Sequence, residues 1–185
     1  IFCECNRGLD GFILDEHSLA SCMEKYSNNL INSISTIDGR ASTTSIHKIK
    51  HGLNSVSQLL WEKNERHLNY IKEFAPNFDE IYLDKFLTEG MCFMLERNGD
   101  EVQILFSYDM LAGYHIAKSI VNQCGDKEEF VDYINNNVQR FFGEKRHPLA
   151  EDIAKSLFYL VPMVYGEQWF MIMPLSEIIL SGIEH

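Results

Sequence analysis

The chain has 185 residues, which is enough to bury a sizeable core in one compact domain or two small ones. Its composition, 45% hydrophobic and 23% charged, is that of a globular protein and excludes an intrinsically disordered chain. The net charge of -11 disfavours a protein that binds a nucleic-acid backbone, because phosphate contacts need concentrated Lys and Arg. The sequence has no signal peptide and no run of about 18 apolar residues, so we expect no membrane partner.

The cysteines are odd in number and lack the regular spacing of a disulfide framework. Most lie in apolar or helical-looking stretches, so we expect reduced, mostly buried thiols and a cytoplasmic location. Cys3 and Cys5 could form half of a metal site, but no second pair of ligands follows, and we expect no bound metal. The five are Cys3, Cys5, Cys22, Cys92 and Cys124.

The chain opens on an apolar, helical-looking run, Ile1 to Cys5, without an initiator Met or a capping residue before it. We therefore expect it to begin within an element and to be a piece of a longer polypeptide. From Ser18, a plausible N-cap, apolar residues recur at threes and fours as far as Ile34, which predicts an amphipathic helix. Residues 1–43 are interpreted as a helical segment.

Three further helices are predicted before residue 90. The first begins near Thr44 and continues to Leu60, and a shorter one begins at Leu68 and stops ahead of Pro76. The third covers residues 77–89, with Gly90 in the C′ position.

After Gly90, the spacing of the apolar residues changes from that of a helix to a period of two. Apolar residues alternate from Met91 to Leu95 and again from Val102 to Phe106, and Asn98-Gly99 lies between the two runs. Asn-Gly between alternating runs is the strongest short-range signal for a β-hairpin.

A helix with a buried stripe follows from Ser107, its predicted N-cap, to Val121. Three helices, a hairpin and a returning helix indicate a winged-helix domain over residues 44–123, in which the hairpin is the wing. Residues 124–185 are predicted to be a C-terminal helical segment. It has a capping box at Asp126, a helix end at Gly143, a new helix opening at His147-Pro148, and breaks at Pro162, Gly166 and Pro174. The fold class is therefore mainly α with one small β-hairpin.

Catalytic motifs are absent from the sequence. There is no P-loop, no Gly-x-Ser-x-Gly, no His-Glu-x-x-His and no paired Cys/His cluster, so we expect no catalytic residues and no enzyme activity in this chain. His47 and His51 share one helix face and could bind a metal, but the flanking Lys48 and Lys50 favour a solvated face.

The passage from the second wing strand into the next helix is a candidate binding site. Free backbone N–H groups and the positive end of the helix dipole face such a junction, which suits an anion such as a nucleotide phosphate. Ser107, Tyr108 and Asp109 are the candidate residues. The alternative is that Ser107 and Asp109 cap the helix and Tyr108 packs.

At this junction the sequence resembles the STAND class of signal-transduction NTPases, the group that contains NACHT and NB-ARC proteins. Their winged helix has a wing strand that leads into a Met-His-Asp-Leu type motif, and residues 107–111 lie where that motif would fall. Phe106-Ser-Tyr-Asp-Met-Leu111 and His115-Ile-Ala117 are most similar to bacterial members, including antiviral ones. Residues 1–6 and 147–166 resemble the lid-like segment before, and the helical segment after, that winged helix.

The resemblance implies a non-catalytic regulatory and oligomerisation module of a larger ATPase. ATP or ADP, with Mg²⁺, would be bound in the parent protein, and this chain would hold no cofactor of its own. Its partners would be the nucleotide-binding core of the same polypeptide and, after activation, further copies of the parent in a homo-oligomer. Tyr108 stands where NB-ARC proteins place a phosphate-contacting His; a phenol can donate a hydrogen bond but carries no positive charge.

Two alternatives stay open. A winged-helix nucleic-acid-binding regulator is disfavoured because the helix in the recognition position is mostly acidic, with Asp79, Glu80, Asp84 and Glu89 around Lys85. The other is an unrelated helical protein-interaction scaffold, to which we give less weight than to the regulatory module.

Overall fold

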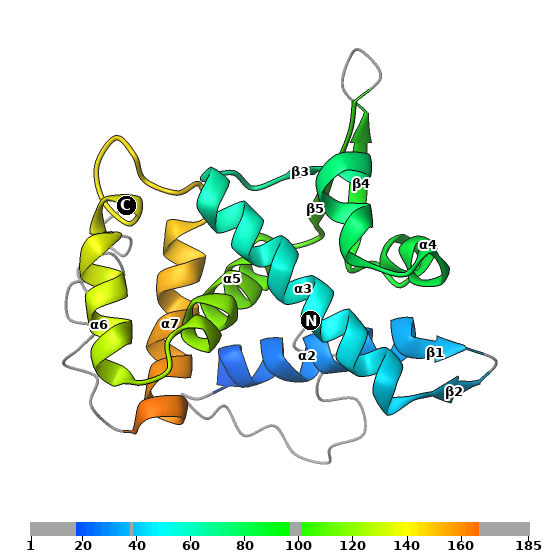
Figure 1. Cartoon of the computed structure of the whole chain (residues 1–185), viewed down its shortest axis with the longest axis horizontal. Coiled ribbons are helices and arrows are strands. Elements are labelled where there is room, and N and C mark those ends of the chain that lie inside the picture. The colour runs from blue at the N-terminus through cyan, green and yellow to red at the C-terminus, as the bar shows by residue number, and fades with distance from the viewer. Residues whose placement is uncertain (1–17, 38, 97–100, 167–185) are drawn as a thin grey trace.

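The computed structural model describes residues 18–37, 39–96 and 101–166 (Figure 1). The chain enters through the long helix α2 (Ser18–Ser35), followed by the short antiparallel strands β1 (Thr36–Ile37) and β2 (Arg40–Ala41). Helix α3 (Thr43–Lys63) then crosses α2. The sequence predicted both helices but treated the β1–β2 hairpin as a polar connection.

A small sheet forms the next part of the molecule. Strand β3 (Leu68–Asn69) precedes a π-helical turn η1 (Tyr70–Phe74), a 3₁₀ turn η2 (Ala75–Asn77) and helix α4 (Glu80–Thr88). Strands β4 (Cys92–Glu96) and β5 (Val102–Phe106) form the hairpin, and β3 pairs with the far side of β5. All pairing is antiparallel, with Ile104 of β5 opposite both Leu68 and Met94.

Helices make up the rest of the described chain. They are α5 (Asp109–Gln123), α6 (Lys127–Asn136), the 3₁₀ turn η3 (Val138–Arg140) and α7 (Ala150–Tyr165). In Figure 1, α5 runs through the middle, with α6 and α7 on one side and the sheet with α4 on the other.

The predicted class, mainly α with a small hairpin, is confirmed. The wing strands lie where the alternating pattern placed them, and Asn98-Gly99 is outside the described residues. The order helix, strand, two helical segments and hairpin, with sheet order β3-β5-β4, is the arrangement of a winged helix. The division at residues 43/44 and 123/124 stays a prediction, since one continuous core joins the elements on both sides of each boundary.

Local sequence signals account for several of the element ends. The Ser42 hydroxyl accepts the Ser45 N–H at 3.0 Å and caps α3, and the Asp126 carboxylate accepts the Glu129 N–H at 2.9 Å and caps α6. Gly90 follows α4 with φ +73°, a conformation that a side chain disfavours.

Three predictions made from the sequence were wrong, one at the short strand β3 and two near prolines. Leu68 begins a strand rather than a helix, because it is buried opposite Ile104 and its backbone completes the sheet. Pro162 lies inside α7 and does not break it; the helix continues for one more turn, and the Pro162 carbonyl accepts the Gly166 N–H at 3.0 Å. The helix predicted to open at His147-Pro148 starts at Ala150, because the His147 ring nitrogen accepts the Leu149 N–H first.

Trp61, near the end of α3, joins the C-terminal helices to the winged helix. Its indole N–H donates to the Tyr133 hydroxyl at 2.8 Å, and its ring packs against Phe141 and His147 at centroid distances of 5.4 and 5.6 Å. The Arg140 guanidinium lies 5.0 Å from the centre of the same ring. Because Trp61 is buried, these contacts hold α6 and the segment after it against α3.

Helix α5 is the centre of the core. Every residue from Leu111 to Ala117 is buried, which requires partners on all faces of the helix, and α2, α3 and α7 supply them. The two helices α5 and α7 approach closely at Gly113, where an added Cβ would lie 2.5 Å from the Cβ of Asp152 and 2.9 Å from the nitrogen of Ile153.

Among the described helices, none has the length and apolar character that a membrane span needs.

Replacement of Gly113 by Ala tests this crossing. The added methyl group would meet the backbone of α7, so we expect Gly113→Ala to lower the free energy of unfolding by about 2 kcal/mol in urea denaturation. Gly125→Ala is the matched control, because its Cβ would meet only the flexible Glu129 carboxylate, and we expect a change under about 0.5 kcal/mol. Equal effects of the two variants would contradict the packing described for α5.

Candidate functional site

The wing strand β5 leads directly into the segment Ser107–Asp109, which we name the wing–α5 junction. The Ser107 N–H donates to the Met91 carbonyl at 3.0 Å, and its hydroxyl donates to the Gly90 carbonyl at 2.7 Å. These two bonds fasten the junction to the turn between α4 and β4. The prediction that Ser107 caps α5 is wrong, because Tyr108 is the N-cap residue of this helix.

Tyr108 is the exposed part of the junction. Its carbonyl accepts the first helical N–H groups of α5, those of Leu111 and Ala112. Its side chain is 46% exposed and meets the Tyr26 ring edge-on at 6.2 Å between centroids. Within the described part of the chain, the Tyr108 hydroxyl makes no hydrogen bond, so it can donate one to a group outside this chain.

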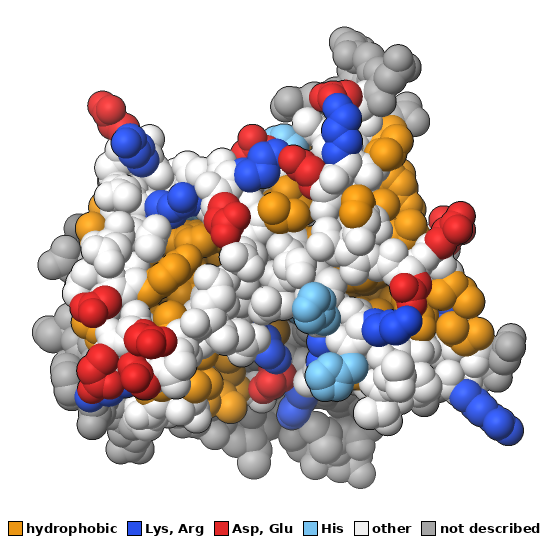
Figure 2. Space-filling view, in the orientation of Figure 1, with side chains coloured by type: hydrophobic (Ala, Val, Ile, Leu, Met, Phe, Trp, Pro, Cys, Tyr) orange, Lys and Arg blue, Asp and Glu red, His pale blue; other side chains and the backbone are white. Residues whose placement is uncertain are grey.

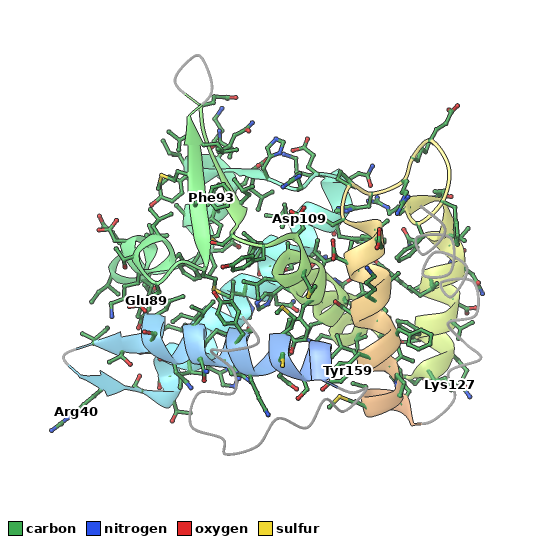
Figure 3. All side chains as sticks on the ribbon, turned by 180° about the vertical axis from the view of Figure 1, so that it is seen from behind. Arg40, Glu89, Phe93, Asp109, Lys127 and Tyr159 are labelled. Atoms are coloured by element: carbon green, nitrogen blue, oxygen red, sulfur yellow. The ribbon has the colours of Figure 1, made fainter. Side chains whose placement is uncertain are left out.

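Asp109 is held by a residue that the sequence did not single out. An Arg66 guanidinium nitrogen lies 2.9 Å from an Asp109 carboxylate oxygen, and both side chains are about half exposed. Figure 3 shows Asp109 at the start of α5 beside α7, where the carboxylate also favours the helix dipole. Arg66 follows α3, whose C-cap residue Asn64 has a left-handed backbone conformation (φ 60°), and no spacing pattern relates Arg66 to Asp109.

The charges around the junction are mixed. Burial raises the pKa of Asp152 on α7, Lys155 opposes that shift, and the negative charge of Asp109 adds to it. A phosphate that entered here would therefore meet two carboxylates and one guanidinium. The structure brings Ser107, Tyr108 and Asp109 to one surface, but the Ser107 hydroxyl points to Gly90 and the Asp109 carboxylate to Arg66. Their role toward a nucleotide stays a prediction.

Directly below the junction lies a buried histidine. The His115 ring stacks on Phe106 at 5.4 Å, and its Nε2 is 3.1 Å from the Ser27 hydroxyl on α2. Burial lowers the pKa of His115 to about 3, and the positive charge of Lys118 adds to the shift. The imidazole is therefore neutral at physiological pH and links α5 to α2 as a hydrogen-bonding group.

The second surface of interest is the helix in the recognition position, α4. Its exposed positions include Glu80, Ile81 and Asp84, while Lys85 donates to the Thr36 carbonyl and so turns toward β1. Lys48 of α3 pairs with Asp79 at 2.8 Å. Figure 2 shows apolar side chains along the edge of the molecule formed by β4 and α4, with acidic groups beside them. Phe93 on β4, labelled in Figure 3, is 41% exposed.

Metal and redox sites find little support in residues 18–37, 39–96 and 101–166. No group of three or more His, Cys, Asp or Glu side chains in these ranges is arranged to hold a metal ion. His47 and His51 are exposed and line a depression of about 340 Å³ between α3 and the start of α4. Cys22, Cys92 and Cys124 are buried, and burial raises the pKa of the Cys92 thiol, which keeps it unreactive. Cys3 and Cys5 are outside the described residues.

No protein-family model, curated protein or solved structure matches the chain. The likeness to STAND proteins therefore depends on the motifs quoted above and on their place in the fold.

The buried His115 predicts a specific pH dependence. The unfolded chain binds a proton near the ordinary pKa of 6.5, whereas the folded chain binds it only near 3, so stability falls as the pH falls through that interval. Between pH 7.5 and pH 5 we expect the wild-type chain to lose about 2 kcal/mol more unfolding free energy than His115→Gln. Urea denaturation at the two pH values measures the difference. Burial also lowers the pKa of His147, but His147 is present in both proteins, so its contribution to the difference cancels. Equal losses would contradict the buried, neutral state of His115.

Proposed function

We propose that this chain is a regulatory, non-catalytic winged-helix module of a larger STAND-type NTPase. The observation that carries the proposal is the position of Phe106-Ser-Tyr-Asp-Met-Leu111: the motif occupies the turn from the wing strand into the central helix α5. By the resemblance, that turn faces the nucleotide-binding core of the parent protein. ATP or ADP with Mg²⁺ binds in that core, and the parent is a cytoplasmic protein that oligomerises on activation, in bacteria as part of antiviral defence.

The contacts of the junction suggest how the module acts. Tyr108 presents an unused hydroxyl to a partner, while the Arg66–Asp109 pair keeps the turn in one conformation. Because α5 is enclosed by α2, α3 and α7, a force applied at Tyr108 acts on all of these helices together. The module would then rotate as one body between a closed, ADP-bound state and an open, oligomerising state.

A protein-interaction scaffold is the second candidate, and the exposed apolar side chains of Phe93 and Leu95 on the wing and Ile81 on α4 favour it. Nucleic-acid binding is a weaker candidate. A winged helix that reads DNA needs cations on α4, whereas Asp84 and Glu80 are exposed there and Lys85 is bonded to a backbone carbonyl.

The intact polypeptide in its source organism provides the first test. We expect a P-loop, followed by an acidic strand that binds Mg²⁺, in the residues that precede Ile1. The isolated 185-residue chain is expected to show no saturable ADP binding by calorimetry, whereas the intact protein binds ADP. A start codon immediately before Ile1 would contradict the proposal.

Variants of the intact protein test the junction itself. Tyr108→Phe removes only the hydroxyl, and Tyr108→Ala also removes the ring that meets Tyr26. If Tyr108 contacts the core, ADP release becomes roughly tenfold faster and oligomers form at lower ATP concentration, as expected for a loss of allosteric coupling. Phe93→Ala is the control, because it removes another exposed aromatic ring outside the junction. Unchanged ADP release and oligomer size in both Tyr108 variants would contradict the assignment.

A further inference from the structure

A cavity of about 130 Å³ lies where α2, α3 and α5 meet. Each helix contributes one face to it: on α3 the lining residues Leu53 and Asn54 lie three and four positions after Lys50, and on α5 and α2 the lining residues are three or four apart. Ile31 and Leu53 form the apolar part of the wall. The polar part consists of Ser27, Lys50, Asn54, His115, Lys118 and Asn122, and we name this space the three-helix cavity.

Two lysines from different helices share the three-helix cavity. Burial lowers the pKa of Lys118, and the positive charge of Lys50 lowers it further, while Glu24 acts in the opposite direction. The nearest Glu24 oxygen is 3.8 Å from the Lys118 nitrogen, a distance longer than a good charge-assisted hydrogen bond. Among the described residues, Lys50 has no ion-pair partner. The Lys118 ammonium also donates to the Tyr114 hydroxyl at 3.2 Å, a neutral partner. In a protein of net charge -11, two cations therefore line one partly buried space whose lining residues include no carboxylate.

The remaining polar groups of the cavity are neutral and can donate hydrogen bonds. The Asn122 amide approaches the Asn54 side-chain oxygen at only 3.4 Å, so this contact is weak and its N–H groups can turn to another acceptor. The Ser27 hydroxyl and the neutral His115 ring also line the cavity and share one hydrogen bond of 3.1 Å, so one of the two donates to the other. The set combines two positive charges with amide and hydroxyl donors, and none of its side chains carries a negative charge.

We propose that the three-helix cavity binds a small tetrahedral oxyanion of the phosphate class. Its volume equals that of about four water molecules, which is room for one phosphate group. Lys50 and Lys118 would provide the charge, and Asn54 and Asn122 would orient the oxygens. The bound anion would remove the repulsion between the lysines and tie α2, α3 and α5 together. This proposal does not depend on the STAND assignment, because the cavity lies wholly within this chain.

Calorimetric titration of the full 185-residue chain with inorganic phosphate, at constant ionic strength, tests the site. We expect saturable binding, with sulfate as a competitor and a rise in melting temperature that chloride does not produce. Lys50→Met and Lys118→Met should each weaken phosphate binding about tenfold, as expected for the loss of a charge-assisted contact. Lys72→Met is the matched control, since Lys72 is an exposed lysine paired with Glu101 elsewhere on the surface.

A parallel titration with AMP separates free phosphate from a phosphate monoester. Competition by AMP would show that the cavity accepts the terminal phosphate of a larger ligand, and binding of inorganic phosphate alone would show an enclosed site for the free anion. Lys50 is exposed, so Lys50→Met keeps the test valid even if Lys118→Met fails to fold. The absence of saturable phosphate binding, or equal affinities in Lys50→Met and Lys72→Met, would overturn the proposal.

Discussion

The close crossing of α5 and α7 at Gly113 determines where the other elements can lie. A side chain at this position would separate the two helices, and α5 would then lose the contacts that keep Leu111 to Ala117 from water. Because α5 also packs against α2 and α3, its position fixes the angle at which the wing strand β5 enters the helix. The wing–α5 junction and the three-helix cavity are both surfaces of this one buried helix, so both depend on that single approach.

Local sequence patterns predicted most of the helices and strands. The alternation around Asn98-Gly99 predicted β4 and β5, and the threes-and-fours spacing predicted α2, α3 and α5. The errors occurred where a distant partner decides the local structure. Leu68 has no strand signature of its own, and it is a strand because Ile104 lies opposite. Pro162 is an error of another kind, since it lies inside α7, which continues to Tyr165.

The residues of the functional surfaces also fall into two groups, those that a local sequence pattern reveals and those that only the fold brings together. Residues 107–109 could be selected from the sequence because a turn between strand and helix is visible as a change of period. Arg66, which pairs with Asp109, could not be selected, since the two residues are brought together only by the fold. The same holds for Lys50 and Lys118, which read as ordinary surface cations until α3 and α5 place them around one cavity.

The third strand of the small sheet has a consequence for the order of folding. β3 is two residues long, and its partners Ile104 and Gln103 follow only after η1, α4 and the whole hairpin. So short a strand gains too little from its own hydrogen bonds to offset the entropy of closing that loop. We therefore expect β4 and β5 to pair first and β3 to join only when α3 and α5 have already docked. The sheet would then be completed by the helices around it, and its outer strand would be the first part of the domain to open.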